Sequence, residues 1–300
     1  MTEPAASIHD LIARTQAASN RNAERFRGAY ADHRAKTTEA IVALPRAGTE
    51  GRLCLLGAGA GLDLELATLA RLYREVVLVD IDAGAIARAR EGVPKELRSR
   101  ITLRGSVELS GLARPLERWR VQAPTAMLLE AELPLAVERV VGAIGGSFDA
   151  VVSCCVLTQL VRAVGQALST EQPLLPEIVR RAVLIHLRAL ALLTAEGGHA
   201  LLVTDVVSSE TYPVETLSDG DDLGAVLASL AAQGNHFMGV APALLQRLSK
   251  RDRVVSERFD APKQLRPWLW RATTDKHFLV YALAFSRRVS SAAGHHDDPA

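Results

Sequence analysis

The sequence has few aromatic residues and almost no excess charge of either sign. Phe, Trp and Tyr make up 4% of the 300 residues, and 35 Lys and Arg residues are balanced by 34 Asp and Glu residues, a formal net charge of +1. Single-stranded nucleic acids are bound largely by aromatic stacking, and nucleic acids and anionic membrane surfaces both attract positive charge. We therefore expect no nucleic-acid partner and no membrane partner.

Cysteine is also scarce. The three cysteines, Cys54, Cys154 and Cys155, lie in apolar runs without a C-x-x-C spacing, and no histidine completes a zinc-binding pattern. Adjacent cysteines pair only through a strained ring. We expect reduced core residues, no metal site and a cytoplasmic protein.

Long apolar runs are missing as well. The most apolar stretch, residues 182–193, is interrupted by His186 and Arg188 and is too short to span a bilayer. Residues 1–10 lack the basic and apolar regions of a signal peptide. With 48% apolar and 23% charged residues, the chain suits a soluble protein with one large α/β domain or two small domains.

Short apolar segments alternate with helical patterns through the middle of the chain. Strands are predicted at residues 53–56, 76–79, 101–103, 148–152 and 199–204, the last entered by a tight turn at Glu196-Gly197-Gly198. This alternation is typical of a parallel sheet with helices on its faces.

The last third breaks this rhythm. Helices are predicted at 223–230 and 242–248, extended segments at 254–259 and 267–272, and an apolar strand at 278–285. This pattern predicts an antiparallel ending on the parallel sheet.

The pattern divides the chain into three parts. Residues 7–44 form one or two helices, so we predict a helical cap over 1–48. An α/β domain follows over 49–289, and the small polar tail 290–300 is expected to be disordered.

Three alternating glycines separate the first predicted strand from a predicted helix. Gly57, Gly59 and Gly61 allow a backbone turn to approach a ligand closely, and the N-terminus of a helix directly after them would offer free N–H donors. A dinucleotide fingerprint would place Gly or Ala where this chain has Leu62, and no Lys follows to make a P-loop. The loop favours a nucleoside ligand over an empty turn.

Two acids follow the second predicted strand. Asp80, nineteen positions after Gly61, ends the strand where a carboxylate can accept both ribose hydroxyls. Asp82 directly precedes a predicted helix and suits an N-cap.

These segments together resemble the strand-end motifs of class I S-adenosylmethionine-dependent methyltransferases. The resemblance covers roughly residues 50–207. It implies a doubly wound, mostly parallel seven-stranded sheet of Rossmann-like type, with S-adenosyl-L-methionine over the carboxyl ends of the first strands. The family's usual acid near the amino acid end of the cofactor is replaced here by Leu55, and a frequent Asp after the third strand is replaced by Ser106. The resemblance implies that the following residues bind the cofactor: Gly57, Ala58, Gly59, Gly61, Asp80, Ile81, Ser106, Val107, Ser153 and Cys154.

Methyl transfer to a small-molecule acceptor is the leading functional prediction. Such transfer needs mainly alignment and exclusion of water, so no catalytic side chain is obligatory. Asp205, Tyr212 and His236 are the candidates, and Asp205 either orients a substrate or caps the next turn. Long insertions near 107–147 and 205–250 are suited to shaping the acceptor pocket.

Three alternatives remain open. One is an enzyme that moves or cyclises the aminopropyl or aminocarboxypropyl part of the cofactor, and another is an inactive methyltransferase-like binding or partner protein. A nicotinamide oxidoreductase is disfavoured by Leu62 in the glycine loop.

Overall fold

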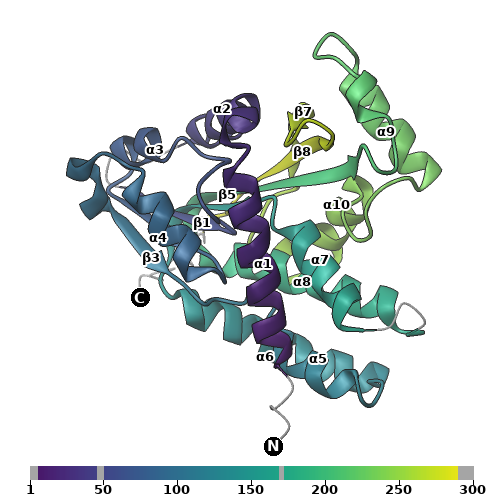
Figure 1. Ribbon diagram of the computed structural model, residues 1–300. Helices are drawn as coiled ribbons and strands as arrows, with labels where there is room; N and C mark the ends of the chain where they lie inside the picture. Colours follow the sequence, from purple (N-terminus) through teal and green to yellow (C-terminus); the bar gives the residue numbers. More distant parts are fainter. Residues whose placement is uncertain (1–5, 46–50, 169–171, 290–300) are drawn as a thin grey trace, which may run out of the picture.

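The computed structural model describes residues 6–45, 51–168 and 172–289, so the predicted tail lies outside the described residues. A single sheet organises them (Figure 1). Its strands are β1 (Arg52–Leu56), β2 (Glu75–Val79), β3 (Ile101–Arg104), β4 (Phe148–Cys154), β5 (Thr194–Ser208), β6 (Lys263–Gln264), β7 (Trp268–Arg271) and β8 (His277–Ser286).

Helices cover both faces of this sheet. The α-helices are α1 (Ile8–Glu24), α2 (Ala31–Val42), α3 (Leu66–Leu72), α4 (Ala83–Glu91), α5 (Ala113–Trp119), α6 (Ala126–Ile144), α7 (Leu157–Ala167), α8 (Leu175–Leu193), α9 (Leu223–Gln233), α10 (Pro242–Arg251) and α11 (Arg253–Ser256). Short 3₁₀ turns are η1 (Arg27–Tyr30), η2 (Lys95–Arg100) and η3 (Val214–Thr216). Among the described helices, none has the length and apolar character needed to cross a membrane.

The strand order confirms the predicted fold class. The order is β3-β2-β1-β4-β5-β8-β6, with β1 to β5 parallel and β8 antiparallel to β5. β6 and β7 both pair with the edge of β8 that β5 leaves free, so two short strands share the seventh position of the sheet. This is a doubly wound, mostly parallel Rossmann-like sheet of eight strands.

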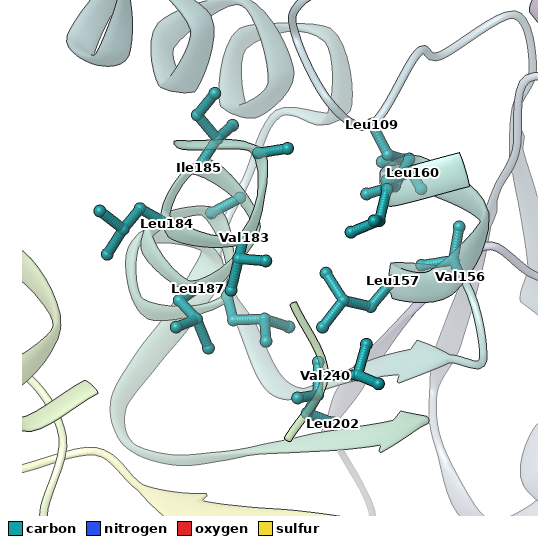
Figure 2. Packing of buried hydrophobic residues seen from close by; sticks show 14 of the residues in the cluster. Leu109, Val156, Leu157, Leu160, Val183, Leu184, Ile185, Leu187, Leu202 and Val240 are labelled. Carbon is teal, nitrogen blue, oxygen red and sulfur yellow. The ribbon is translucent and has the colours of Figure 1, made fainter. Parts of the chain in front are cut away.

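Successive side chains of each strand point to opposite faces of the sheet and pack into two hydrophobic cores. Cys54 and Leu56 point to the face covered by α6, α7 and α8, whereas Leu53 and Leu55 point to the face covered by α2, α3 and α4. Figure 2 shows the first core, where Leu157 and Leu160 of α7 lie opposite Val183 of α8. Both faces of the sheet are buried, which explains its continuous apolar strands.

Two local predictions are wrong. Residues 253–256 form helix α11 rather than a strand, because Asp252 accepts a hydrogen bond from the Val255 amide and also binds Arg188 of α8. Residues 196–198 form no separate tight turn. β5 instead begins at Thr194 and runs through them, with an irregular register against β4.

The N-terminal helices contribute to both cores rather than standing apart. Ile8 of α1 is buried in the first core and Ile41 of α2 in the second. Figure 1 shows α1 (purple) crossing in front of the sheet, and its backbone at Ile8 donates a hydrogen bond to Glu117 of α5. These helices therefore cover the carboxyl ends of the parallel strands.

Candidate functional site

The glycine loop after β1 adopts a backbone that only glycine takes readily. Gly57, Gly59 and Gly61 have φ of +73°, +48° and +66°. A Cβ on Gly57 would lie 2.4 Å from the Cβ of Val156, and one on Gly61 would lie 2.8 Å from Leu66. At Gly57 and Gly61, contacts with other residues of the protein leave no room for a Cβ, so glycine is needed there even without a ligand.

The helix after this loop begins later than predicted. α3 starts at Leu66, and residues 62–64 form a turn and a bend before it. The Glu65 amide, directly before α3, donates a hydrogen bond to Oγ1 of Thr38 on α2 at 2.9 Å. Free N–H groups of a helix terminus are therefore not placed at the glycines.

Asp80 connects the end of β2 to the glycine loop. One carboxylate oxygen accepts from the Gly59 amide at 2.8 Å and the other from the Asp82 amide at 2.9 Å. The side chain is buried, and burial raises its pKa to about 6 although the backbone hydrogen bonds act in the opposite direction. Each oxygen retains a second lone pair, so a ribose hydroxyl could still donate to it.

Asp82 caps α4, as predicted. Its Oδ1 accepts from the Ala85 amide at 3.0 Å. Its Oδ2 accepts from the Asn20 side chain of α1, also at 3.0 Å. The cap is therefore also an attachment point for the N-terminal helix.

α1 is fastened directly over the glycine loop. Asn20 is buried, accepts a hydrogen bond from Gln16 at 3.2 Å, and places its Oδ1 3.2 Å from where a Cβ of Gly59 would lie. Glu24 also pairs with Arg88 of α4 at 2.8 Å. The space above Gly59 is thus occupied by Asn20.

A narrow cavity of about 40 Å³ lies between α1 and the strand ends. Ligand pockets for drug-sized molecules usually measure roughly 300–1,000 Å³. In this position of α1, the cavity is far too small for a nucleoside. Its lining joins residues of the β2 and β3 ends, α1 and α7: Asp80, Ile81, Val107, Glu108, Leu109, Ile12, Gln16, Val156, Gln159, Leu160 and Ala163.

Two residues at this edge carry backbone strain. Ser106 after β3 and Cys155 after β4 have φ of +59° and +47°, conformations that cost a non-glycine residue roughly 1–3 kcal/mol and cluster at functional sites. Ser106 is exposed, whereas Cys155 is buried. Burial raises the pKa of the Cys155 thiol well above its usual value, so it is no thiolate nucleophile.

The side chains of Ser153 and Cys154 point to opposite faces of β4. Ser153 is fully buried and its Oγ lies 2.8 Å from Nε2 of His186 on α8. Cys154 belongs to the core beneath α2 and α3, which also includes the buried Ala58. Neither side chain lines the cavity.

A second group of polar residues lies near the ends of β4 and β5. Asp205 is buried three residues before β5 ends and accepts from Thr158 at 2.7 Å. Burial raises its pKa to about 6. Asp63, in the turns after Gly61, has its pKa raised to about 7, first by burial and then by the charge of Asp205.

His33 of α2 faces Asp63. Its Nε2 lies 3.5 Å from Asp63 Oδ1, and its Nδ1 accepts from the Trp268 indole at 3.0 Å. Burial lowers the pKa of His33 to about 3, so the ring is neutral and its single proton is on Nε2.

The other two catalytic candidates, Tyr212 and His236, have contacts elsewhere. The segment containing His236 is held to β5, since the Phe237 amide donates to the Val206 carbonyl at 2.8 Å. His236 Nδ1 lies 3.0 Å from the Phe237 carbonyl, and Tyr212 packs against the core. A broad depression of about 550 Å³ between Gly220–Gly224 and Gln264–Pro267 contains none of the predicted site residues.

The sequence interpretation missed Asp63, His33 and Asn20. Asp63 had one visible signal, an acid inside the apolar run Leu62-Asp63-Leu64 directly after the glycine loop. The pairing of His33 with Trp268 joins residues 235 positions apart, and no local pattern reports it.

No protein-family model and no curated protein matches the chain. Similar solved structures include a TehB-like SAM-dependent methyltransferase from Corynebacterium glutamicum, with 14% identity over 90% of this chain and 99% of that one, at a TM-score of 0.44. CrArsM, an arsenic(III) S-adenosylmethionine methyltransferase from Chlamydomonas reinhardtii, has 17% identity over 83% and 68%, at 0.41. N-methyltransferase NodS from Bradyrhizobium japonicum has 13% identity over 80% and 87%, at 0.36. The fold class is assigned from the strand order of the sheet and does not depend on these distant structural similarities.

Proposed function

We propose that the protein binds S-adenosylmethionine at the carboxyl edge of its parallel sheet and transfers the methyl group to a small-molecule acceptor. The observation that carries this proposal is the link from Asp80 at the end of β2 to Gly59 in a loop of three left-handed glycines. In this fold, ligands bind outside the carboxyl ends of the strands.

The residues around the cavity suit the cofactor, but the cavity is too small for it unless α1 moves. Asp80 would accept the ribose hydroxyls, Ile81 and Val107 would contact the base, and Ser106 could hydrogen-bond it. When bound, the cofactor supplies an electrophilic methyl group on a sulfonium. The protein's own part is to align the acceptor and exclude water, for which α1 is suitably placed. Since the cavity measures about 40 Å³, α1 must shift for binding.

Calorimetric titration with S-adenosylhomocysteine and with NAD tests the binding. We expect S-adenosylhomocysteine to bind and NAD not to bind appreciably, and selective NAD binding would refute the assignment. Incubation with S-adenosylmethionine and cell extract then tests the reaction by mass analysis. S-adenosylhomocysteine as product supports methyl transfer, whereas methylthioadenosine alone, above spontaneous breakdown, supports transfer or cyclisation of the amino acid part. Binding without either product supports an inactive partner protein.

A further inference from the structure

Most of the large apolar side chains that the protein exposes lie on α6 and the turn before it. Among the described residues, seven large apolar side chains are exposed, and four of them are Val121, Met127, Leu128 and Leu135. Val121 and Met127 are 87% and 81% exposed. Figure 1 shows α5 and α6 at the lower edge of the molecule. Exposed apolar residues normally occur singly, so such a concentration marks an interaction site.

α6 is apolar on its outer side as well as on its inner side. The inner side packs into the first core through residues such as Leu133 and Val137. Intervals of three and four residues place a second set of side chains, all exposed, on the opposite side of the helix. We call this set the outer stripe, and it consists of Met127, Leu128, Ala131, Pro134, Leu135 and Glu138. Only Glu138 in the stripe is polar, whereas a helix that is apolar all round is normally buried.

An ordinary surface helix of this protein looks different. The exposed positions of α10 are Ala243, Arg247, Lys250 and Arg251, so three of the four are charged. Charged residues of this kind keep the outer side of a helix in water. The outer stripe of α6 lacks them and therefore suits a protein partner.

Two opposite charges at the ends of the outer stripe are left without a partner. The other acids of α6, Glu130 and Glu132, are paired with arginines. Glu138, in the second half of α6, and Arg120, in the turn that follows α5, are both exposed. Neither forms an ion pair among the described residues. One end of the stripe is therefore negative and the other positive.

The outer stripe is complementary to a second copy of itself running in the opposite direction. With Ala131 facing Ala131 of the partner subunit, residues equally far from this position in opposite directions meet. Met127 then lies opposite Leu135 of the partner subunit, and Leu128 lies opposite Pro134 of the partner subunit. The small side chain at the centre lets the two helices approach closely, and the larger side chains pack on both sides of it.

The same arrangement brings the two unpaired charges together. Glu138 lies seven positions after Ala131, so it meets the chain just before the N-terminus of the partner subunit's α6, where Arg120 of the partner subunit lies. The N-terminus of a helix also carries a partial positive charge. Two-fold symmetry forms this contact twice.

A membrane surface fits the outer stripe less well. Helices that lie on anionic membranes carry Lys and Arg on their polar side. α6 has three glutamates, Glu130, Glu132 and Glu138, against one arginine, Arg139. Its charge favours another copy of the chain over anionic lipid.

We propose that the protein forms a symmetric homodimer in which the outer stripes of two α6 helices pack antiparallel, with Arg120 and Glu138 paired at both ends. This proposal does not depend on the proposed function. One helix face with a turn is small beside the roughly 1,600 Å² that a typical stable interface buries. The dimer should therefore be reversible, with a dissociation constant on the order of micromolar.

Sedimentation velocity of the full chain, from about 1 to 200 µM, tests the dimer. The parent protein should change from monomer to dimer over this range. Ala131→Arg places two guanidinium groups opposite each other at the centre of the contact, so it should raise the dissociation constant at least about tenfold. Ala232→Arg, on the exposed side of α9, is the matched control and should dimerise like the parent. Both alanines are exposed, and thermal unfolding confirms that each variant is folded.

A charge exchange tests the antiparallel arrangement. Glu138→Arg and Arg120→Glu should each weaken the dimer a few-fold, and the double variant should recover the parent's dissociation constant. Single exchanges without effect, or a double variant that recovers nothing, overturn this arrangement.

Two other results overturn the dimer itself. One is a parent protein that stays monomeric at about 200 µM, and the other is a dimer that Ala131→Arg leaves intact. A monomeric parent that sediments with vesicles of phosphatidylcholine and phosphatidylglycerol would assign the outer stripe to a membrane instead.

Discussion

At the scale of single residues, Asp80 has a structural role besides the ligand-binding role that the sequence predicts. Its position after β2 predicts a ribose contact, but its carboxylate also holds the Gly59 and Asp82 amides. This strand-end residue therefore supports the fold as well as the predicted ribose contact. Removing it leaves amide donors without their acceptors.

Asp80→Ala should lower both stability and cofactor affinity. We expect a loss of about 1–3 kcal/mol in the free energy of unfolding, measured in urea without ligand, and at least about a tenfold loss of affinity for S-adenosylhomocysteine. Asp82→Ala is the contrast, with about 1 kcal/mol lost with the N-cap and a much smaller change in affinity. The reverse order of affinities would exchange the roles of the two acids.

At the scale of elements, α1 determines whether the cavity can admit a ligand. Asn20 fastens the helix to Asp82 and fills the space above Gly59. When the competent arrangement is only partly populated, apparent affinity falls by that fraction. Loosening α1 should therefore favour binding.

Asn20→Ala should strengthen S-adenosylhomocysteine binding by a few-fold and speed amide hydrogen exchange in α1. Gln233→Ala, on the exposed surface of α9, is a control that should change neither measurement. Weaker binding by Asn20→Ala would instead identify Asn20 as a ligand contact.

The sequence predicted most elements because their signals are local. The five parallel strands, the Asp82 cap and the glycine loop can all be found from neighbouring residues. The start of α3 could not be predicted from neighbouring residues, because the Glu65 amide there donates to Thr38 of α2, which lies 27 positions earlier. The direction of Ser153 was missed for the same kind of reason, since its partner His186 lies on a helix that follows in the chain.

At the scale of the whole molecule, the buried Asp80 and Asp205 and the partly exposed Asp63 all have raised pKa values at the carboxyl ends of the parallel strands. A carboxyl whose pKa is raised by folding binds more protons in the folded than in the unfolded state. Its contribution to stability is complete below the unfolded pKa near 3.8 and is lost as pH rises through the folded pKa. His33 acts in the opposite direction, because its pKa is lowered to about 3.

Asp63→Asn isolates one of these acids. Relative to the parent, the variant should gain stability as pH rises from about 4 to 8, by on the order of 2 kcal/mol in the free energy of unfolding. Urea unfolding at several pH values measures the difference. A difference that is independent of pH would mean that Asp63 titrates as an ordinary exposed acid.

The contacts that attach α1 also determine when this helix docks during folding. This helix leaves the ribosome before the groups that hold it, because Asp82 and Glu117 are made 62 and 109 residues after their partners in α1. Contacts between such distant positions form slowly, because a long loop must close first. α1 is thus among the last elements to dock, and until it does, the glycine loop of a nascent or refolding molecule is not covered by Asn20.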